Sequence, residues 1–576
     1  MDQPYKSGIL HIGDLAIGGH HPVRIQSMTT TPTLNTQETV AQTIRLIEAG
    51  CELVRITAQN VHEAKHLQVI SDELHKRGFR MPLIADIHYK PEAAEVAARI
   101  VEKVRINPGN YVDRKRGRIN FSNEDYAGEL DRIRERIKPL IRICREYGTA
   151  LRIGANHGSL SERILYRYGD TPNGMVESVM EFIEICEDLG FREMILSLKA
   201  SNVKVMVQAN RLLVRRMLDT GRYYPIHLGV TEAGDGEDGR IKSAAGIGSL
   251  LMDGIGDTIR VSLTEEPEYE IPVAKILANK YASGGGSTKQ DKIILDAGDF
   301  YDPFAYNRRL SAKTFNVGGN RPPVVVLTGS KKDPSEIQFP KDRFPDFFAD
   351  HNGLTFYPAD SGNPVKPLTI QSSEDIQKLD HNQLQVLIFD LGDEQSLHEI
   401  RNWFRILSVN RNESPVILKK KFGRLELPEL LISSAAELGF FLVDGLGDGI
   451  WIESEIITAD VLTSISFGIL QATGSRITRT EFIACPSCGR TLFNIQETLQ
   501  KIKLRTAHLK GLKIGVMGCC VNGPGEMADA HYGYVGAGKG KVTLYKGRKI
   551  MKTSVPEDKA LDELVDLIKL NNDWID

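Results

Sequence analysis

The sequence predicts an α/β protein with three parts: a (β/α)₈ TIM barrel over residues 1–284, a degenerate barrel-like α/β insert over 285–475, and a C-terminal α+β domain over 476–576. Three observations predict this fold class. Short β-branched runs alternate with helical patterns eight times before residue 280, a glycine-rich stretch follows them, and one barrel segment recurs in altered form later. At 576 residues the chain is also longer than one hydrophobic core usually supports.

Eight runs rich in β-branched residues are the predicted barrel strands. They lie at 22–28, 51–57, 82–87, 103–107, 150–154, 193–198, 225–229 and 257–262. Stretches with helical periodicity separate them, for example at 36–49, 61–77, 126–147, 174–189 and 202–218. Right-handed crossovers would place these helices outside a closed parallel barrel. A doubly wound open sheet is the alternative, and the count of eight units favours the barrel.

The segment YASGGGSTKQ at 281–290 is typical of a flexible linker. A second α/β region follows it, with strand-like runs at 322–329, 385–392 and 415–420.

An internal repeat lies within this second region. The segment 251–266 recurs as 442–457, so that Asp253 matches Asp444 and Asp257 matches Asp448. The turn glycines are kept, whereas Arg260 is replaced by Trp451, which removes a cation suited to phosphate. We therefore interpret the insert as structural rather than as a second active site.

Composition and charge exclude few functions. The net charge of −3 gives no support to nucleic-acid or membrane-surface binding, and no run approaches the ~20 apolar residues of a membrane span. The N-terminus has no signal-peptide pattern. Three cysteines lie singly in the first half and are expected in the core (Cys51, Cys144 and Cys186), while four cluster near the end. This pattern predicts reduced thiols plus one metal site in a cytoplasmic protein.

Chemistry in a (β/α)₈ barrel takes place at the C-terminal ends of the strands. In strand order, the polar residues there are Gln26, Arg55 and Thr57, Asp86 and His88, Arg105 and Asn107, Arg152 and Asn156, Lys199 and Ser201, His227 with Thr231 and Glu232, and Arg260 with Ser262. Five of these strand ends carry Arg or Lys, and five cations at one mouth repel each other unless an anion lies among them. Because Arg matches phosphate oxygens, the pattern predicts a substrate with one or two phosphates. The alternative for each single Arg is a local carboxylate partner.

A second cluster of candidate ligands lies near the C-terminus. It comprises Cys485 and Cys488 in a C-x₂-C pair, the adjacent Cys519 and Cys520, and Glu526. A C-x₂-C pair alone fits zinc or a redox dithiol. Adjacent cysteines cannot easily point at one tetrahedral ion, whereas an iron–sulfur cube binds each thiolate at its own iron. The spacing therefore favours a cluster over zinc, held by three cysteines and one oxygen ligand from Glu526. A carboxylate is a weak ligand for cluster iron and could yield to a substrate oxygen.

These residues together resemble the 4-hydroxy-3-methylbut-2-enyl diphosphate synthase family of the methylerythritol phosphate pathway. The runs that carry the resemblance are RIQSMTTT (24–31), ADIHY (85–89), RINPGN (105–110), RIGANHGS (152–159), LKAS (198–201), HLGVTEAG (227–234), GIGDTIRVSL (254–263), CPSCGR (485–490) and GCCVNGPGE (518–526). The insert looks like that of the three-domain form of the family.

The resemblance implies a reaction and a cofactor. The substrate would be 2-C-methyl-D-erythritol 2,4-cyclodiphosphate, opened and dehydroxylated with two electrons to (E)-4-hydroxy-3-methylbut-2-enyl diphosphate. It also implies a 4Fe–4S cluster on Cys485, Cys488, Cys519 and Glu526, with Cys520 as a spectator. Glu232 is the expected proton donor to the departing oxygen. The residues expected to bind the substrate are Arg55, Asp86, Arg105, Asn107, Arg152, Asn156, Lys199, His227, Thr231, Arg260 and Ser262.

The resemblance also bears on partners. Ferredoxin or flavodoxin is expected as electron donor, because the chain shows no dinucleotide fingerprint. Two-domain members of the family are head-to-tail dimers whose cluster domain serves the partner's barrel. The insert here is expected to act as a spacer that lets the C-terminal domain cap its own barrel, although a homodimer stays possible. Two rival functions remain open: a zinc-stabilised binding module on a sugar-phosphate barrel, and a lyase that uses Lys199 as a Schiff-base amine.

Overall fold

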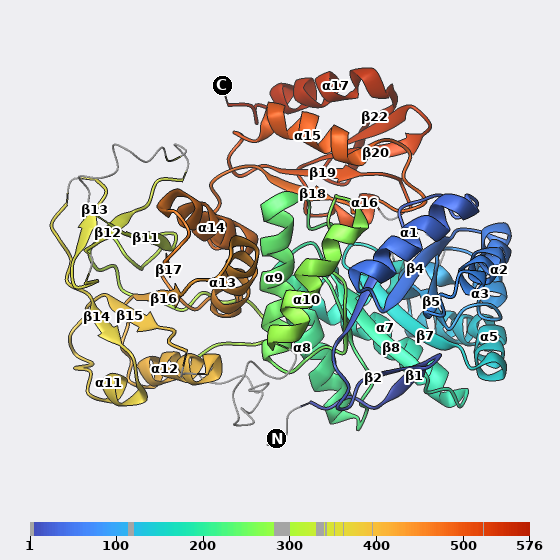
Figure 1. Ribbon diagram of the computed structural model, residues 1–576, viewed down its shortest axis with the longest axis horizontal. Coiled ribbons are helices and arrows are strands. Elements are labelled where there is room, and N and C mark those ends of the chain that lie inside the picture. The colour runs from blue at the N-terminus through green and yellow to red at the C-terminus, as the bar shows by residue number, and fades with distance from the viewer. Residues whose placement is uncertain are drawn as a thin grey trace.

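The computed structural model describes residues 5–112, 120–281, 300–329, 339, 343–350, 352–360, 362–393, 396–521 and 523–575. The N-terminal barrel lies beside the insert, and the C-terminal domain lies above the barrel in the view of Figure 1. All but the first residue of the predicted linker at 281–290, and the predicted boundary between 284 and 285, fall outside the described residues.

Eight parallel strands form the barrel and confirm the predicted fold class. They are β3 (Arg24–Met28), β4 (Leu53–Ala58), β5 (Leu83–Ile87), β6 (Lys103–Ile106), β7 (Ala150–Asn156), β8 (Met194–Lys199), β9 (His227–Leu228) and β10 (Thr258–Ile259). The strand order is β8-β7-β6-β5-β4-β3-β10-β9, and a parallel bridge between Leu196 and Ile226 joins the two ends of this sheet. Because the ring closes in this way, the open doubly wound sheet is excluded.

A short hairpin that the sequence analysis did not predict covers the base of the barrel. Its strands are β1 (Leu10–Ile12) and β2 (Leu15–Ile17), joined by a tight turn at Gly13. Leu10, Ile12 and Ile17 pack against residues from the first half of four barrel strands, among them Leu53 and Ile195. The hairpin therefore seals the end opposite the strand termini that carry the polar residues.

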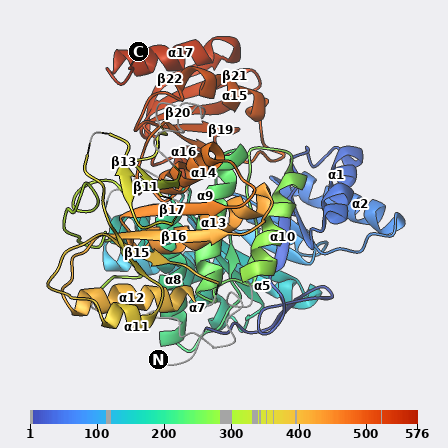
Figure 2. The same ribbon diagram turned by 60° about the vertical axis from the view of Figure 1, so that its left-hand side comes forward.

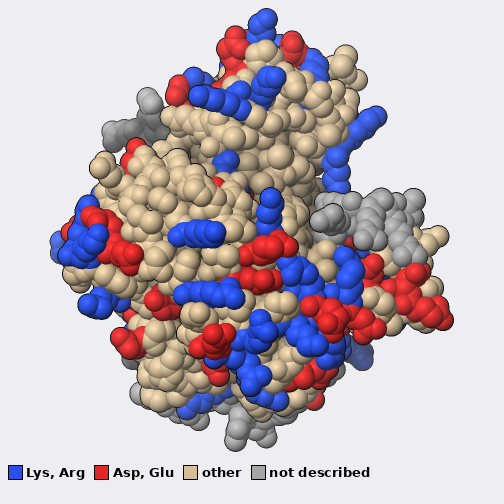
Figure 3. All heavy atoms as spheres, turned by 90° about the vertical axis from the view of Figure 1, so that its right-hand side faces the viewer, with Lys and Arg blue, Asp and Glu red and all other residues tan. Residues whose placement is uncertain are grey.

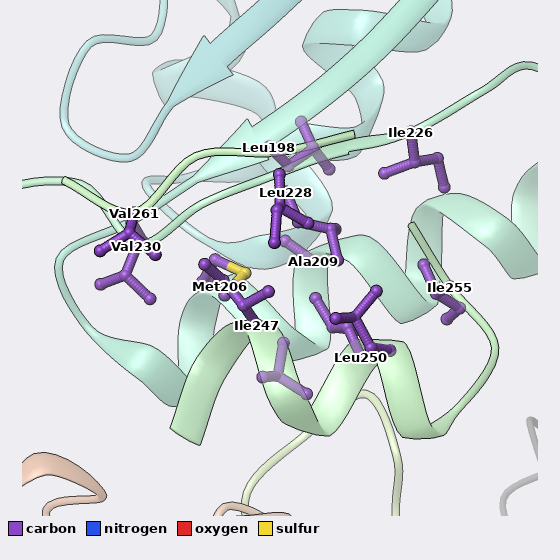
Figure 4. Packing of buried hydrophobic residues seen from close by; sticks show 14 of the residues in the cluster. Leu198, Met206, Ala209, Ile226, Leu228, Val230, Ile247, Leu250, Ile255 and Val261 are labelled. Carbon is purple, nitrogen blue, oxygen red and sulfur yellow. The ribbon is translucent and has the colours of Figure 1, made fainter. Parts of the chain in front are cut away.

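Helices and one 3₁₀ turn surround the barrel. They are α1 (Thr36–Ala49), α2 (Val61–Lys76), α3 (Pro91–Ala97), α4 (Pro108–Tyr111), α5 (Asn123–Tyr147), α6 (Glu162–Tyr168), α7 (Pro172–Asp188), α8 (Val203–Asp219), α9 (Gly236–Met252), the 3₁₀ turn η1 (Pro267–Tyr269) and α10 (Glu270–Tyr281). Figure 4 shows the apolar layer between the strands and helices α8 and α9, where Leu228 and Val261 meet Met206 and Ile247. Burial of such side chains is the main source of barrel stability.

The insert is a second curled sheet with helices. Its strands are β11 (Val324–Thr328), β12 (Phe347–Ala349), β13 (Phe356–Pro358), β14 (Leu368–Ile370), β15 (Leu387–Asp390), β16 (Val416–Phe422) and β17 (Gly449–Ser454). Their order is β13-β12-β11-β17-β16-β15-β14, so β13 and β14 are the edge strands. Among the described strands of this sheet, β12 and β13 pair antiparallel and the other neighbours pair parallel. Its helices are α11 (Ser373–Gln377), α12 (Leu397–Val409), α13 (Leu427–Leu442) and α14 (Ala459–Ala472). In Figure 2, β16 and β17 lie on the side of the molecule that faces the viewer.

The barrel and the insert meet through equivalent helices, α9 and α13. A Cβ placed on Gly248 would lie 2.5 Å from the Cβ of Ala436, and a Cβ on Gly439 would lie 2.8 Å from the Cβ of Ala245. Gly248 is equivalent to Gly439, and Ala245 to Ala436, because each pair is separated by the same 191 positions that separate Asp253 from Asp444. The same surface is therefore used on both sides, as in an interface between two identical subunits.

Two buried arginines complete this interface. Arg211 of α8 and Arg401 of α12 each contact both Asp253 and Asp444, with 2.7 Å between Arg211 Nε and Asp253 Oδ2 and 2.7 Å between Arg401 Nη2 and Asp444 Oδ2. All four side chains are at most 3% exposed. Burial alone would raise the pKa of Asp253, but the two guanidinium groups hold it below its ordinary value. The residues that mark the sequence repeat thus face each other across its two copies.

The C-terminal domain is a five-stranded sheet with helices on both faces. Its strands are β18 (Glu481–Ala484), β19 (Lys513–Met517), β20 (Tyr532–Gly538), β21 (Lys541–Lys546) and β22 (Lys549–Pro556), in that order across the sheet, the first three parallel and the last two antiparallel. Helices α15 (Ile495–Thr506) and α17 (Glu557–Leu570) pack on one face, and the short α16 (Gly523–Glu526) lies next to Met517 on the other. No helix in the part of the chain that the structure describes is long and apolar enough to cross a bilayer.

Candidate active site

A pocket lies where the C-terminal domain covers the mouth of the barrel. Most of the predicted site residues line it together: Arg55, Asp86, Arg105, Arg152, Asn156, Lys199, Thr231, Glu232, Arg260, Ser262, Cys485, Cys488, Cys519 and Glu526. The first ten come from the barrel: Arg55 and Arg152 lie within their strands, and the others lie near strand ends or in the loops after them. The last four come from the C-terminal domain. Residues more than 200 positions apart in the sequence thus share one cavity.

The five predicted cations differ in how they are paired. Arg260 Nη2 lies 3.1 Å from Glu270 Oε1, and Arg105 Nη1 lies 3.3 Å from Asp86 Oδ1, so a local carboxylate accounts for these two. Arg152 is 1% exposed, and its Nε and Nη1 find no acceptor among the described residues.

Arg55 and Lys199 contact no carboxylate among the described residues. The guanidinium of Arg55 contacts the thioether sulfur of Met28, with Nη2 at 2.9 Å. Burial and then the neighbouring arginines Arg152 and Arg55 hold the pKa of Lys199 well below its ordinary value. Uncompensated buried cations are costly, so this part of the pocket favours a bound anion.

Asp86 and His88 form a buried network with two arginines. His88 Nε2 lies 3.2 Å from Asp86 Oδ2 and 3.0 Å from Arg105 Nη1. Burial lowers the pKa of His88 to about 3, against the opposing effect of Asp86, so the imidazole is neutral at pH 7. From the C-terminal domain, Arg490 reaches in and places its Nη2 3.4 Å from Asp86 Oδ2.

Two predicted substrate contacts lie outside the pocket lining. Asn107 caps helix α4, because its Oδ1 accepts from Gly109 N at 3.0 Å while its Nδ2 donates to Ser159 Oγ. His227 is fully buried within the barrel, and its Nδ1 lies 2.7 Å from Thr258 Oγ1. The short loop-forming run and the strand end are present as predicted, but these two side chains serve the scaffold around the pocket.

Glu232 lies in a strained conformation at the edge of the pocket. Its φ is +50°, in the left-handed region that a non-glycine residue adopts only when its surroundings require it. Burial, and then the nearby Glu526 carboxylate, raise the pKa of Glu232 well above its ordinary value. Its Oε2 has no hydrogen-bond partner among the described residues. A protonated carboxyl with one free oxygen can donate a proton to a group in the pocket.

The thiols and Glu526 line the pocket from above. Cys485 follows β18, Cys519 follows β19, and Glu526 ends helix α16, where its Oε1 accepts from Asn156 Nδ2 at 2.6 Å. Among the described residues, no three His, Cys, Asp or Glu side chains converge on a point that one metal ion could occupy. Cys485, Cys488, Cys519 and Glu526 reach the cavity from separate loops, and thiolate and carboxylate side chains are donors that an iron–sulfur cluster binds, each at a different iron. Cys520 is exposed and does not line this pocket.

Backbone contacts hold the two domains together around the site. Ala233 and Ala484 form a parallel bridge, and Thr264 Oγ1 lies 3.1 Å from the carbonyl oxygens of both Ala484 and Cys485. Gly158 of the barrel meets Gly525 of the C-terminal domain so closely that a Cβ on Gly158 would lie 1.9 Å from the Gly525 carbonyl oxygen. The pocket is therefore closed by backbone as well as by side chains.

The sequence analysis missed Arg490 and Met28 as pocket residues, and it placed His88 at a strand end without assigning it a contact. Arg490 directly follows the C-x₂-C-Gly run, so its proximity to the ligands was available as a signal. It belongs to a loop of the C-terminal domain, whereas the pattern of cations in the sequence concerns the barrel strands.

Comparison with known proteins identifies related chains. The model of the GcpE TIM-barrel domain matches residues 8–275, and that of the GcpE protein C-terminal domain matches residues 481–570. A relative in Parabacteroides distasonis named 4-hydroxy-3-methylbut-2-en-1-yl diphosphate synthase (flavodoxin) is 46% identical, over 99% of this chain and 98% of its own. One of the same name in Leptospira interrogans is 42% identical over 100% and 98%. Among solved structures, a dihydropteroate synthase from Burkholderia cenocepacia has a TM-score of 0.34 and 14% identity, covering 48% of this chain and 98% of its own.

Proposed function

The chain belongs to the GcpE family of 4-hydroxy-3-methylbut-2-en-1-yl diphosphate synthases, and from this premise we propose how its residues divide the work of that reaction. The enzyme carries out the reductive ring opening and dehydroxylation of 2-C-methyl-D-erythritol 2,4-cyclodiphosphate to (E)-4-hydroxy-3-methylbut-2-enyl diphosphate. One observation above all supports the division of roles: cations that form no ion pair among the described residues, a protonatable Glu232 and three thiols with Glu526 line one pocket.

The diphosphate is assigned to the barrel side of the pocket. Arg55, Arg152 and Lys199 form no ion pair with a carboxylate among the described residues, so they gain most from a bound phosphate. Arg105 and Arg260 are already held by Asp86 and Glu270, and their remaining N–H groups add directed donors. The substrate is thereby oriented with its ring toward the C-terminal domain.

The iron–sulfur cofactor is assigned to the opposite side. Cys485, Cys488, Cys519 and Glu526 would hold a 4Fe–4S cluster, which supplies single electrons and a Lewis-acidic iron when bound. Asn156 steers the Glu526 carboxylate through its amide. Glu232 holds the proton on the free Oε2 side and gives it to the departing hydroxyl, which leaves as water.

Flavodoxin is the proposed electron donor, because the relatives' names specify it. The seven cysteines are all free in the structure, which suits a reducing compartment, and the cytoplasm is the proposed location. The proposed domain boundaries lie between residues 284 and 285 and between residues 475 and 476.

The test is anaerobic turnover of the cyclic diphosphate with a low-potential reductant, together with metal analysis. The purified protein is expected to contain iron and sulfide and to absorb at about 400 nm, as clusters do. Cys519→Ser is expected to lose both the absorbance and turnover, whereas the matched Cys520→Ser keeps them. A colourless protein with one zinc per chain and no turnover would contradict the proposal.

A further inference from the structure

A second, larger cavity lies beside the active site on the flank of the molecule. Its volume is about 940 Å³, and it is lined by barrel residues such as Tyr89, Lys90 and Tyr111 and by four residues of the C-terminal domain: Cys520, Val521, Pro524 and Gly525. It shares no lining residue with the substrate pocket.

One loop forms the wall between the two cavities. Cys519, Gly523 and Glu526 of this loop line the substrate pocket, while Cys520, Val521, Pro524 and Gly525 line the flank cavity. The two proposed ligands Cys519 and Glu526 are therefore separated from the flank cavity by the thickness of a single chain segment. Cys520 is exposed, and Tyr89, which is 52% exposed, donates a hydrogen bond of 2.8 Å to the carbonyl oxygen of Val521.

This wall is a second side from which the proposed cluster site can be approached. The substrate pocket lies between the barrel and the C-terminal domain, and the flank cavity on the other side of the loop borders the exposed Tyr89, Lys90 and Cys520. The reaction needs two electrons from outside the chain, so a donor must approach a face where little protein separates it from the ligands. Among the described residues, the flank cavity provides that face.

The charge of the neighbouring hairpin indicates the kind of partner. Strands β21 and β22 with their turn span an acid-free run, residues 538–553, that contains six Lys or Arg residues in a chain whose net charge is −3. All six are exposed, and the outer strand β22 also exposes Ile550 by 52% and Met551 by 39%. A basic surface with exposed apolar side chains fits a partner with an acidic rim and an apolar centre.

The hairpin reaches the rim of the flank cavity. Arg548 Nη2 lies 2.6 Å from Asp170 Oδ2, and the other oxygen of Asp170 accepts from the backbone N–H of Gly158, a cavity residue, at 2.9 Å. Tyr545 of β21 packs with Met527, just beyond the loop, under the same sheet. Figure 3 shows basic side chains at the lower edge of the C-terminal domain overhanging the barrel, whose own surface mixes both charges.

We propose that the flank cavity, with Lys90 on its barrel side and the β21–β22 hairpin above it, is the docking surface for flavodoxin, and that the face of the donor which docks here is acidic. This inference rests on the proposed function. Each docking delivers one electron from the reduced flavin toward the loop that carries Cys519 and Glu526, so one turnover takes two dockings and oxidises two donor molecules by one electron each.

Binding of oxidised flavodoxin tests the surface without turnover. The holoenzyme and a Lys90→Glu/Lys549→Glu variant are titrated with oxidised flavodoxin by calorimetry at low salt. The variant is expected to bind flavodoxin at least about tenfold more weakly. Added salt is expected to reduce the affinity of the unmodified enzyme for flavodoxin more steeply than that of the variant. The matched control is Lys510→Glu/Lys559→Glu, which reverses two exposed lysines elsewhere in the same domain and is expected to bind normally.

Turnover with two reductants separates this inference from the proposed function. With reduced flavodoxin, the docking variant is expected to raise the KM for the donor about tenfold or more, whereas with reduced methyl viologen, which needs no protein interface, its rate is unchanged. If the unmodified enzyme showed no turnover with reduced methyl viologen, that result would count against the proposed function and not against docking. Unchanged flavodoxin affinity in the variant, an equal loss in the control, or equally tight binding of an acidic protein without a redox group would overturn the docking surface.

Discussion

Single residues at the barrel mouth fall into two classes that the sequence could not distinguish. Arg105 and Arg260 have carboxylate partners, Asp86 and Glu270, whereas Arg152 has unpaired donors. All three are arginines on a barrel strand or directly after one, so position alone predicted the same role for each. The pairing of Arg260 depends on Glu270, which begins helix α10 and reaches back into the barrel from a segment that periodicity assigned only to a helix.

Arg490 is the residue whose contribution the structure predicts most sharply. Its side chain is 10% exposed, its Nη2 contacts only Asp86 among the carboxylates, and its Nε and Nη1 find no acceptor among the described residues. A substrate phosphate oxygen would satisfy those donors. Arg490→Gln is expected to lower kcat/KM by about a hundredfold, mainly through KM, since charged hydrogen bonds contribute about 1.5–3 kcal/mol.

Steady-state kinetics and iron content test Arg490 together. Iron per chain is expected to stay at the level of the unmodified enzyme, which separates substrate binding from cofactor loading. Arg490→Lys keeps the charge and should recover part of the KM effect, and Arg505→Gln, a half-exposed arginine of the same domain, should change nothing. A kcat/KM within about twofold of the unmodified value would remove Arg490 from the substrate site.

Among the elements, those with a regular apolar period were predicted and those without one were not. All eight barrel strands and the five named helices are present near their predicted positions. Helix α9 gave no amphipathic signal, because every residue from Ile241 to Met252 is buried between the barrel and the insert. The β1–β2 hairpin was missed although Gly13-Asp14 between alternating apolar residues is a turn signal.

The start of β18 anchors the C-terminal domain electrostatically. Glu481 Oε1 lies 2.6 Å from Lys242 Nζ of α9, and its Oε2 lies 3.3 Å from Lys513 Nζ of β19. Burial alone would raise the pKa of Glu481, but the two lysines lower it to about 2. Because the folded pKa lies below the ordinary value of 4.5, this stabilisation is complete above pH 4.5 and is lost as the pH falls toward about 2.

Glu481→Gln is therefore expected to lower the free energy of unfolding by about 3 kcal/mol at pH 7. The difference in the free energy of unfolding between the variant and the unmodified chain should be about 1 kcal/mol smaller at pH 4 than at pH 7. The reason is that Glu481 becomes protonated in the unfolded state of the unmodified chain over this pH range. Urea denaturation at the two pH values measures both quantities. The control is Glu497→Gln, which breaks an exposed pair with Lys501 and should cost less than about 1 kcal/mol at either pH. A difference that grows at pH 4 would contradict this assignment.

At the scale of the whole molecule, the internal repeat predicted equivalence but not contact. The match of Asp253 with Asp444 was visible in the sequence, whereas their meeting through Arg211 and Arg401 depends on how the two copies pack. Because α13 covers α9, the face of the barrel that an identical subunit could use in this way is occupied by the chain's own insert. The arrangement supports the expectation that the C-terminal domain caps the barrel of the same chain.

Mixing two inactive chains tests that expectation. A Glu232→Ala chain keeps the proposed ligands, and a Cys519→Ser chain keeps the proposed proton donor. Same-chain capping predicts no more activity in the mixture than in the separate variants, since neither chain holds a complete site. Recovery of about a quarter of the normal rate or more, after the two chains are co-expressed, would show that the domain serves a partner's barrel. Each variant mixed with unmodified enzyme should leave the latter's rate intact.

The contact between Gly158 and Gly525 limits how closely the C-terminal domain can approach the barrel at this point. Where side chains set such a limit, a different rotamer can move it, but here peptide touches peptide and no rotamer is available. The closest approach of the two domains at this contact is consequently set by the main chain, in every conformer in which these loops touch. Substitutions around the active site can therefore change its chemistry, whereas the spacing between the two domains at this contact depends on the two glycines.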